Sequence, residues 1–178
     1  SMNFRYKYTE TELKNLLQSI VVVVDTREKV NKHVTDWFDK KKIPYITKAL
    51  DNGDYNCYLP RNEEMGILKD IWLDRDLFFE RKASLDELAG NLTKHRARFE
   101  EELATTKALS KYLIIENATY ADVVNGNYKS DYNSKSYLGT LHSFNHKYDL
   151  QIVFMPDPSY TPVFLYGTMQ YYLRDILK

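Results

Sequence analysis

Acidic side chains stand at three places where a strand is expected to begin or end, and their types and spacing suit chemistry. Asp25 and Glu28 follow four consecutive valines. Asp54 follows a turn, and Glu80 lies near the end of the segment LFFERK. Neighbouring strands lie about 5 Å apart, so a sheet can bring such strand ends together. Clustered carboxylates repel one another and are costly to desolvate, and a divalent cation relieves that cost. The pattern therefore predicts a metal site.

The ligand chemistry indicates which metal this site would hold. Carboxylate oxygens are hard ligands that suit Mg²⁺ or Mn²⁺. The four histidines and the one cysteine do not have the spacing of a zinc site. We therefore expect Mg²⁺ (or Mn²⁺), held by Asp54, Glu80 and either Asp25 or Glu28.

Lys82 gives the expected site a cation of its own. Glu80 and Lys82 are two residues apart, so on a strand their side chains leave the same face. An ammonium group beside the metal would position the attacking water or stabilise charge that develops on a phosphate. Arg81 points to the opposite face, and we expect Arg81 and Arg27 to stabilise the carboxylates or to meet phosphate.

Each of these segments also has an ordinary structural interpretation. The run from Asp25 to Glu28 could be a polar strand exit, and charge runs such as Glu80–Lys82 usually mark a solvated strand end. Asp54 could serve only the turn that it follows. Asp86, at the start of a predicted helix, could complement the helix dipole instead of supporting the site.

A basic segment follows the acidic ones, and it consists of Lys94, His95, Arg96 and Arg98. Such a run on a helix is often just a solvated face. Beside an acidic metal site it is better suited to contact DNA phosphates, which position a duplex without reading its sequence. Arg98 is the favoured contact. Tyr128, Tyr132 and Tyr137 could stack on unpaired bases, although surface or packing roles are preferred for them.

The elements that must position these residues alternate between strands and helices. We expect an α/β domain with a central mixed sheet flanked by helices. Two Ser/Thr-x-x-Glu capping boxes, at Thr9 and Ser84, should each start a helix, and the second helix should run to about Ala108. Thr161 is the expected N-cap of the last helix. The stretch from Pro60 to Asp74 is either a loop or an extra hairpin.

Length and composition set the outer limits. A chain of 178 residues suits one domain over 1–178, with a core of about 20–155 and a C-terminal helix of about 162–177. The 25 basic and 25 acidic residues balance, which neither announces nor excludes a nucleic-acid partner. Cys57, the one cysteine, fits a reducing compartment. No apolar run approaches the roughly 20 residues that span a membrane.

Taken together, the motifs resemble those of the XPF-type structure-specific endonucleases, within the PD-(D/E)XK nuclease superfamily. The family signature is a V-D-x-R-E strand end, followed by G-D, by E-R-K and by an aspartate four residues after the lysine. The matching residues are Val24–Glu28, Gly53-Asp54, Glu80–Lys82 and Asp86. The downstream RARFEEEL also resembles a family helix in which an arginine faces the substrate. Ordinary structural interpretations would have to hold independently at every one of these places.

The resemblance implies a restriction-endonuclease-like fold and metal-dependent hydrolysis of DNA near flaps or single-strand/double-strand junctions, leaving 5′-phosphate and 3′-hydroxyl ends. It implies catalytic roles for Asp25, Glu28, Asp54, Glu80 and Lys82. It implies DNA-binding or supporting roles for Arg27, Arg81, Asp86, Arg96 and Arg98. Expected partners are DNA and a second nuclease-domain subunit, identical or different. The expected location is the cytoplasm of a bacterium or phage-infected host, or the nucleus of a eukaryote.

Two features depart from the family pattern. Its members commonly add a tandem helix-hairpin-helix domain, and many add a helicase region, and we expect neither in these 178 residues. A minimal version of this kind is expected of a phage or prophage protein. The alternative function is a non-catalytic DNA-binding or scaffolding subunit, although here every motif acid and the lysine are intact. A ribonuclease or a repair nuclease for linear ends is a weaker option.

Overall fold

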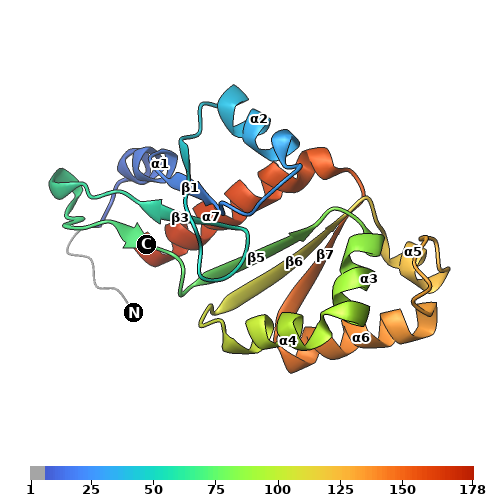
Figure 1. Cartoon of the computed structure of the whole chain (residues 1–178). Coiled ribbons are helices and arrows are strands. Elements are labelled where there is room, and N and C mark those ends of the chain that lie inside the picture. Colours follow the sequence, from blue (N-terminus) through green and yellow to red (C-terminus); the bar gives the residue numbers. More distant parts are fainter. Residues whose placement is uncertain (1–6) are drawn as a thin grey trace. The chain divides into compact units, whose positions relative to one another are not determined.

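The four valines form β1, the central strand of the first of two units in the computed structural model, which describes residues 7–178 (Figure 1). This unit runs to Asp74 and also takes in Pro162–Lys178. β1 pairs in parallel with β2 and antiparallel with β3, and β3 pairs antiparallel with β4. The strands are β1 (Val21–Val24), β2 (Tyr45–Thr47), β3 (Tyr55–Leu59) and β4 (Ile71–Trp72). The pairing of β3 with β4 confirms the hairpin alternative for the stretch after Pro60.

Helices accompany this sheet in the first unit, and the sequence explains where the first one begins. The Thr9 hydroxyl accepts the Glu12 N–H at 3.1 Å, and Glu12 Oε1 accepts the Thr9 N–H at 2.9 Å, which confirms the capping box. α1 also contacts α7, because Arg174 Nη2 lies 2.9 Å from Glu10 Oε2. The helices are α1 (Glu10–Gln18), α2 (Lys32–Lys40), the 3₁₀ turn η1 (Glu63–Met65) and α7 (Thr161–Leu177).

The second unit, Arg75–Thr161, contains three parallel strands in the order β5-β6-β7. One face of these strands is covered by α3, α4 and α6, and Figure 1 shows these helices on the same side. The buried core there includes Leu113 and Ile115 of β6 together with Leu88 of α3 and Phe144 of α6. The elements are β5 (Leu77–Lys82), α3 (Leu85–Lys94), α4 (Arg96–Thr105), β6 (Ser110–Glu116), α5 (Tyr120–Val124), α6 (Ser134–Lys147), β7 (Leu150–Met155) and the 3₁₀ turn η2 (Pro158–Tyr160).

The prediction of one long helix from Ser84 to about Ala108 was wrong, because the helix breaks at His95. This residue has φ −132° and ψ 30°, outside the helical region. A straight helix of that length would extend about 36 Å, whereas a six-residue strand extends about 20 Å. The break lets both halves pack on one sheet, since Leu92 before it and Phe99 after it share the same core.

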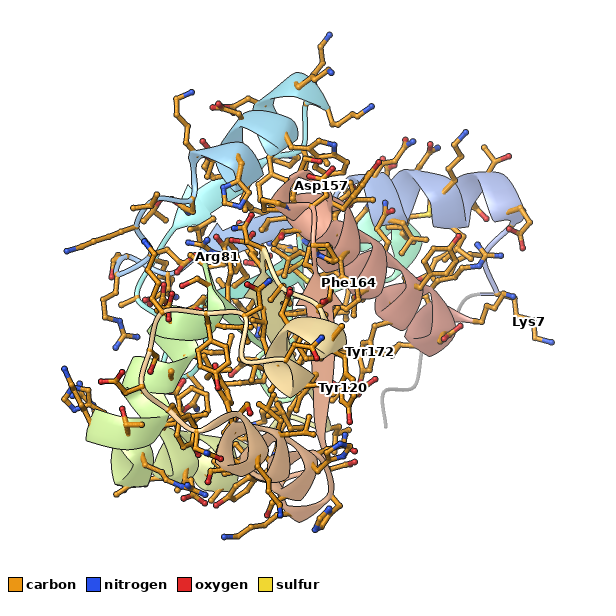
Figure 2. The ribbon with its side chains drawn as sticks, turned by 90° about the vertical axis from the view of Figure 1, so that its right-hand side faces the viewer. Lys7, Arg81, Tyr120, Asp157, Phe164 and Tyr172 are labelled. Atoms are coloured by element: carbon orange, nitrogen blue, oxygen red, sulfur yellow. The ribbon has the colours of Figure 1, made fainter. Side chains whose placement is uncertain are left out.

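The predicted N-cap at Thr161 was also wrong. Thr161 already has helical φ and ψ (−54°, −50°), and its buried hydroxyl donates a hydrogen bond to Glu116 Oε2 at 2.6 Å. The Thr161 hydroxyl thus binds the Glu116 carboxylate, whereas an N-cap hydroxyl would accept a backbone N–H of the helix. Asp157, labelled in Figure 2, caps the preceding η2 turn by accepting the Ser159 N–H at 3.0 Å.

The expected fold class is confirmed. The described residues contain seven strands, both parallel and antiparallel, and helices flank them. The organisation of 1–178 as one domain stays a prediction. Among residues 7–178, no helix combines the length and the apolar character needed to cross a membrane.

Candidate functional site

Asp25 is buried directly after β1, and donors of its own chain surround its carboxylate. Oδ2 accepts the Arg27 Nε–H at 2.8 Å and the Arg27 backbone N–H at 3.1 Å. Oδ1 accepts the Leu50 N–H at 2.8 Å and Arg27 Nη2–H at 3.2 Å. Burial raises the pKa of Asp25, but the hydrogen bonds from Arg27 and Leu50 outweigh it, so the pKa lies below its usual value. The ionised carboxylate therefore organises the chain that leaves β1.

Asp54 is placed beside Asp25 by a turn that requires glycine. Gly53 has φ +78°, a left-handed conformation that glycine adopts without a steric penalty. The Asp54 carbonyl then accepts the Asp25 N–H at 2.9 Å, so the two motif aspartates are neighbours across the β1–β3 pair. Asp54 itself is half-buried.

Glu28 is linked to the strand that follows Asp54. The hydroxyl of the fully buried Tyr55 donates to Glu28 Oε2 at 2.5 Å. The same hydroxyl accepts Asn31 Nδ2–H at 3.3 Å. Tyr55 thus holds both ends of the segment between Glu28 and Asn31, and it brings Glu28 to the same part of the first unit as Asp25 and Asp54.

The charged end of β5 lies in the second unit. Lys82 Nζ is 3.5 Å from Glu80 Oε1 and 4.0 Å from Glu87 Oε1. The side chains of Glu80 and Lys82 are only 12% and 11% exposed. The ammonium also lies 5.5 Å from the centre of the Phe99 ring, a cation–π distance. An acid and a base thus meet on one face of the strand, as the two-residue spacing predicts.

Arg81, labelled in Figure 2, belongs to a different environment from its neighbours. Its Nη1 lies 2.7 Å from Glu116 Oε1, and the two side chains are 4% and 2% exposed. A guanidinium enclosed in this way supports the end of the strand. Its expected role toward the metal-site carboxylates or phosphate stays a prediction. Arg27 differs, because its side chain is 70% exposed while it binds Asp25.

Asp86 anchors a loop in the second unit. Its Oδ1 accepts the backbone N–H groups of Lys129 and Ser130 at 2.9 and 2.7 Å. The tyrosines of this region pack on one another, with the Tyr132 and Tyr137 ring centres 4.9 Å apart and Tyr137 fully buried. The packing role preferred for these rings is therefore the one that the structure has.

The two motif arginines of α4 differ in what they contact. Arg96 Nε lies 3.1 Å from Glu100 Oε2, and its guanidinium lies over the Phe144 ring. Arg98 is exposed and has no side-chain partner within residues 7–178. Arg98 is thus the arginine of this pair that is open to a phosphate.

The predicted site residues fall into two groups. The first unit holds Asp25, Arg27, Glu28 and Asp54, and the second holds Glu80, Arg81, Lys82, Asp86, Arg96 and Arg98. In the part of the chain that the structure describes, no three histidine, cysteine or acidic side chains are placed to hold a metal ion. The sharing of one ion by Asp54 and Glu80, which belong to different units, stays a prediction.

The sequence interpretation missed residues that contact the motif side chains. Glu87 was assigned to a capping box, and its Oε2 accepts the Ala83 N–H at 3.4 Å while Oε1 faces Lys82. No role in the site was assigned to Phe99, which contacts Lys82, or to Tyr55, which contacts Glu28. Glu87 lies in the first turn of α3, shortly after Lys82, and this closeness in the chain is the signal that could have indicated the contact.

Comparison with known proteins decides the family. A family model described as the ERCC4 domain matches residues 24–167, which is most of the chain. This chain belongs to the ERCC4 domain family. The matched range includes all four places where the sequence fits the family signature, so the resemblance seen in the sequence is confirmed. No curated protein sequence matches the chain.

Solved structures with the same fold support this membership. XPF from Aeropyrum pernix superposes with a TM-score of 0.61 at 18% identity, covering 88% of this ERCC4 chain and 66% of that chain. XPF from Aeropyrum pernix in complex with DNA gives 0.62 at 18% identity, with coverage of 87% and 66%. At this identity the likeness shows the fold. The chain matches about two thirds of the length of those proteins.

Proposed function

We propose that this chain is a Mg²⁺- or Mn²⁺-dependent DNA endonuclease that acts at flaps, branches or single-strand/double-strand junctions. The observation that carries the proposal is the end of β5, where Glu80 and Lys82 meet at 3.5 Å in a largely enclosed position. Family membership supports it, because the ERCC4 match spans every motif residue. XPF from Aeropyrum pernix has been solved in complex with DNA, which supports DNA as the substrate class.

The carboxylates fit a hard divalent cation, since they offer only oxygen ligands. Asp54 and Glu80 would hold the ion, with Glu28 or Asp25 as the third acid. The Asp25 carboxylate accepts four hydrogen bonds from Arg27 and Leu50, which suits a residue that shapes the loop. A bound ion would supply positive charge that offsets the charge of the scissile phosphate.

Lys82 would position the attacking water and stabilise the phosphate as charge develops on it. The ring of Phe99 and the carboxylates of Glu80 and Glu87 limit where its ammonium can go. Arg98 would contact the DNA backbone, and the exposed Arg27 would approach the phosphate or stabilise the carboxylates. A second subunit docking through this domain is part of the same proposal.

The test is a cleavage assay with end-labelled 3′-flap, 5′-flap, splayed and linear duplex DNA, each with and without Mg²⁺. We expect cuts near the branch that require the metal and are absent from the linear duplex. Asp54→Asn should abolish cutting while DNA affinity stays near that of the wild type. Cutting retained by this variant would remove Asp54 from the site.

The same assay separates the alternatives. A scaffolding subunit would bind branched DNA but leave it intact under every metal condition. Single-stranded RNA and blunt duplex, added as substrates, distinguish a ribonuclease or an end-processing nuclease. Absence of cleavage on every substrate, by protein with a cooperative unfolding transition, would contradict the proposed function.

A further inference from the structure

The last residue of β6 and the residue after it contact both chain neighbours of Lys82. Glu116 binds the side chain of Arg81, and Asn117 Nδ2 donates to the Ala83 carbonyl at 3.1 Å. Lys82 lies between these two attachment points. It is also the last residue of β5 to pair with β6, opposite Ile115. Beyond that pair the regular ladder ends, so side chains must hold the strand end in place.

The contact between Glu116 and Arg81 is a buried charge pair whose glutamate is bound at both oxygens. Oε1 receives Arg81 Nη1 at 2.7 Å, and Oε2 accepts the Thr161 hydroxyl at 2.6 Å. A charged hydrogen bond of this length fixes distance and direction together. Buried pairs of this kind are weak arguments for stability, because desolvation offsets much of the attraction. A role in geometry explains better why the pair adjoins Lys82.

Asn117 reaches Ala83 from an unusual backbone conformation. Its φ is +57°, in the left-handed region that asparagine tolerates better than most residues. Its own N–H donates to the Met155 carbonyl at 2.8 Å, so the residue is held by β7 while its side chain holds the segment after β5. The left-handed turn directs the amide back across the end of the sheet.

We propose that Glu116 and Asn117 are positioning residues for Lys82, acting through Arg81 and Ala83 on either side of it. With both neighbours held, the Lys82 side chain leaves the strand in one direction, toward Glu80, Glu87 and the Phe99 ring. The catalytic consequence rests on the proposed nuclease function. The positioning itself does not, and it can be observed without cleavage.

Two variants separate the two contacts. Asn117→Gly keeps a residue that accepts the left-handed backbone and deletes only the amide that binds Ala83. Glu116→Gln removes the charge that pairs with Arg81 while preserving shape. The matched control is Asp149→Gly, which replaces an exposed residue with φ +52° between α6 and β7, away from Lys82 in the chain and in strand register.

The direct readout is the Lys82 side chain, observed by NMR after reductive ¹³C-methylation of lysines and assigned by its loss in Lys82→Arg. In the wild type we expect a signal separated from those of exposed lysines, because the ammonium lies near a ring face and two carboxylates. In Asn117→Gly and Glu116→Gln it should move toward the exposed lysines, and in Asp149→Gly it should not move. An unmoved signal in both variants would overturn the proposal.

Cleavage measured in parallel tests the consequence for catalysis. We expect kcat to fall about 10- to 100-fold in both variants, the usual effect of removing a residue that orients a catalytic group, with DNA affinity unchanged. A triple variant, Arg81→Met, Glu116→Met and Thr161→Val, removes both buried charges and the hydroxyl that would lose its acceptor, so it should regain thermal stability without regaining kcat. If kcat recovered together with stability, the Arg81–Glu116 pair would have only a structural role, which would contradict the proposal. A wild type that does not cut, with a Lys82 signal that moves as expected, would contradict the nuclease function alone.

Discussion

The acidic segment after β1 and the charged end of β5 use their charges differently. At the first, the Asp25 carboxylate accepts four hydrogen bonds of 2.8 to 3.2 Å, three from Arg27 in its own loop and one from Leu50 after β2. At the second, Lys82 faces carboxylates at 3.5 and 4.0 Å, and within residues 7–178 its ammonium makes no hydrogen bond. The distances at Asp25 are those of ordinary hydrogen bonds, whereas the distances at Lys82 are longer.

This difference separates charges that build structure from charges that are ready for a substrate. Removing Asp25 leaves the N–H of the half-buried Leu50 and three N–H donors of Arg27 without their acceptor, so the loss falls mainly on stability. Removing Lys82 leaves no donor or acceptor unmatched, so the loss should fall mainly on catalysis. In the second region, the buried Arg81–Glu116 pair fixes the end of β5, while the contacts of the Lys82 ammonium are longer than hydrogen bonds.

The largest expected effect is at Lys82. Replacing Lys82 with Met should lower kcat by about 10² to 10³-fold, the usual range for losing one group that stabilises charge in the transition state. The measurement is single-turnover cleavage of the best flap substrate. Lys107→Met, at an exposed position between α4 and β6, is the control and should cut like the wild type. Near-normal cutting by Lys82→Met would break the distinction between the two regions.

Asp25 should show the opposite balance. Asp25→Asn keeps the shape but loses acceptor capacity toward Arg27 and Leu50, so we expect the free energy of unfolding to fall by about 1–3 kcal/mol. Urea unfolding followed by circular dichroism measures this. Glu80→Gln is the comparison, and it should leave the unfolding midpoint nearly unchanged while abolishing cleavage. If Asp25→Asn and Glu80→Gln lowered the free energy of unfolding equally, both acids would have the same structural role, which would contradict the prediction.

The same residue predicts a dependence of stability on pH. The pKa of Asp25 is lower in the folded protein than its reference value of 3.8, so the folded state favours the ionised form. Its contribution to stability is fully present above about pH 4 and is lost as pH falls through the lower, folded pKa. Unfolding free energies of the wild type and Asp25→Asn should therefore converge toward acid pH. Curves that stay parallel from neutral pH to acid would contradict the assignment.

The smallest expected effect concerns the two arginines of α4. Arg98→Ala should weaken DNA binding a few-fold and reduce the slope of log affinity against log salt by about 1, as for one lost phosphate contact. Arg96→Ala should leave that slope unchanged and lower the unfolding midpoint, because Arg96 binds Glu100 and packs on Phe144. Fluorescence anisotropy at several salt concentrations measures both. A reversed result would mean that exposure is a poor guide to DNA contact here.

Local signals predicted most of the fold. Alternation, capping boxes and turn residues predicted the strands and the starts of α1 and α3, because these features depend on neighbours in the sequence. The break at His95 depends on the width of the sheet beneath the helix, and the position of Thr161 depends on Glu116, 45 residues away. Neither can be read from a local pattern.

The candidate site shows the same limit. The spacing of Glu80 and Lys82 was enough to predict that they meet, since alternation on a strand is local. The partners of the motif residues were not predictable in this way. Glu116 lies on another strand, and Asn117 reaches Ala83 only because of its left-handed backbone conformation. Phe99 lies on α4, the part of the predicted long helix that follows its break.

The central claim, that Asp54 and Glu80 hold one divalent ion, can be tested by replacing Mg²⁺ with Fe²⁺ and adding ascorbate and peroxide. Hydroxyl radicals formed at the bound iron cut the nearby polypeptide, and mass spectrometry locates the cuts. We expect cuts close to both Asp54 and Glu80, suppressed by excess Mg²⁺ and absent in Asp54→Asn. Cuts at only one of these segments, or cuts that Mg²⁺ does not suppress, would contradict a shared ion.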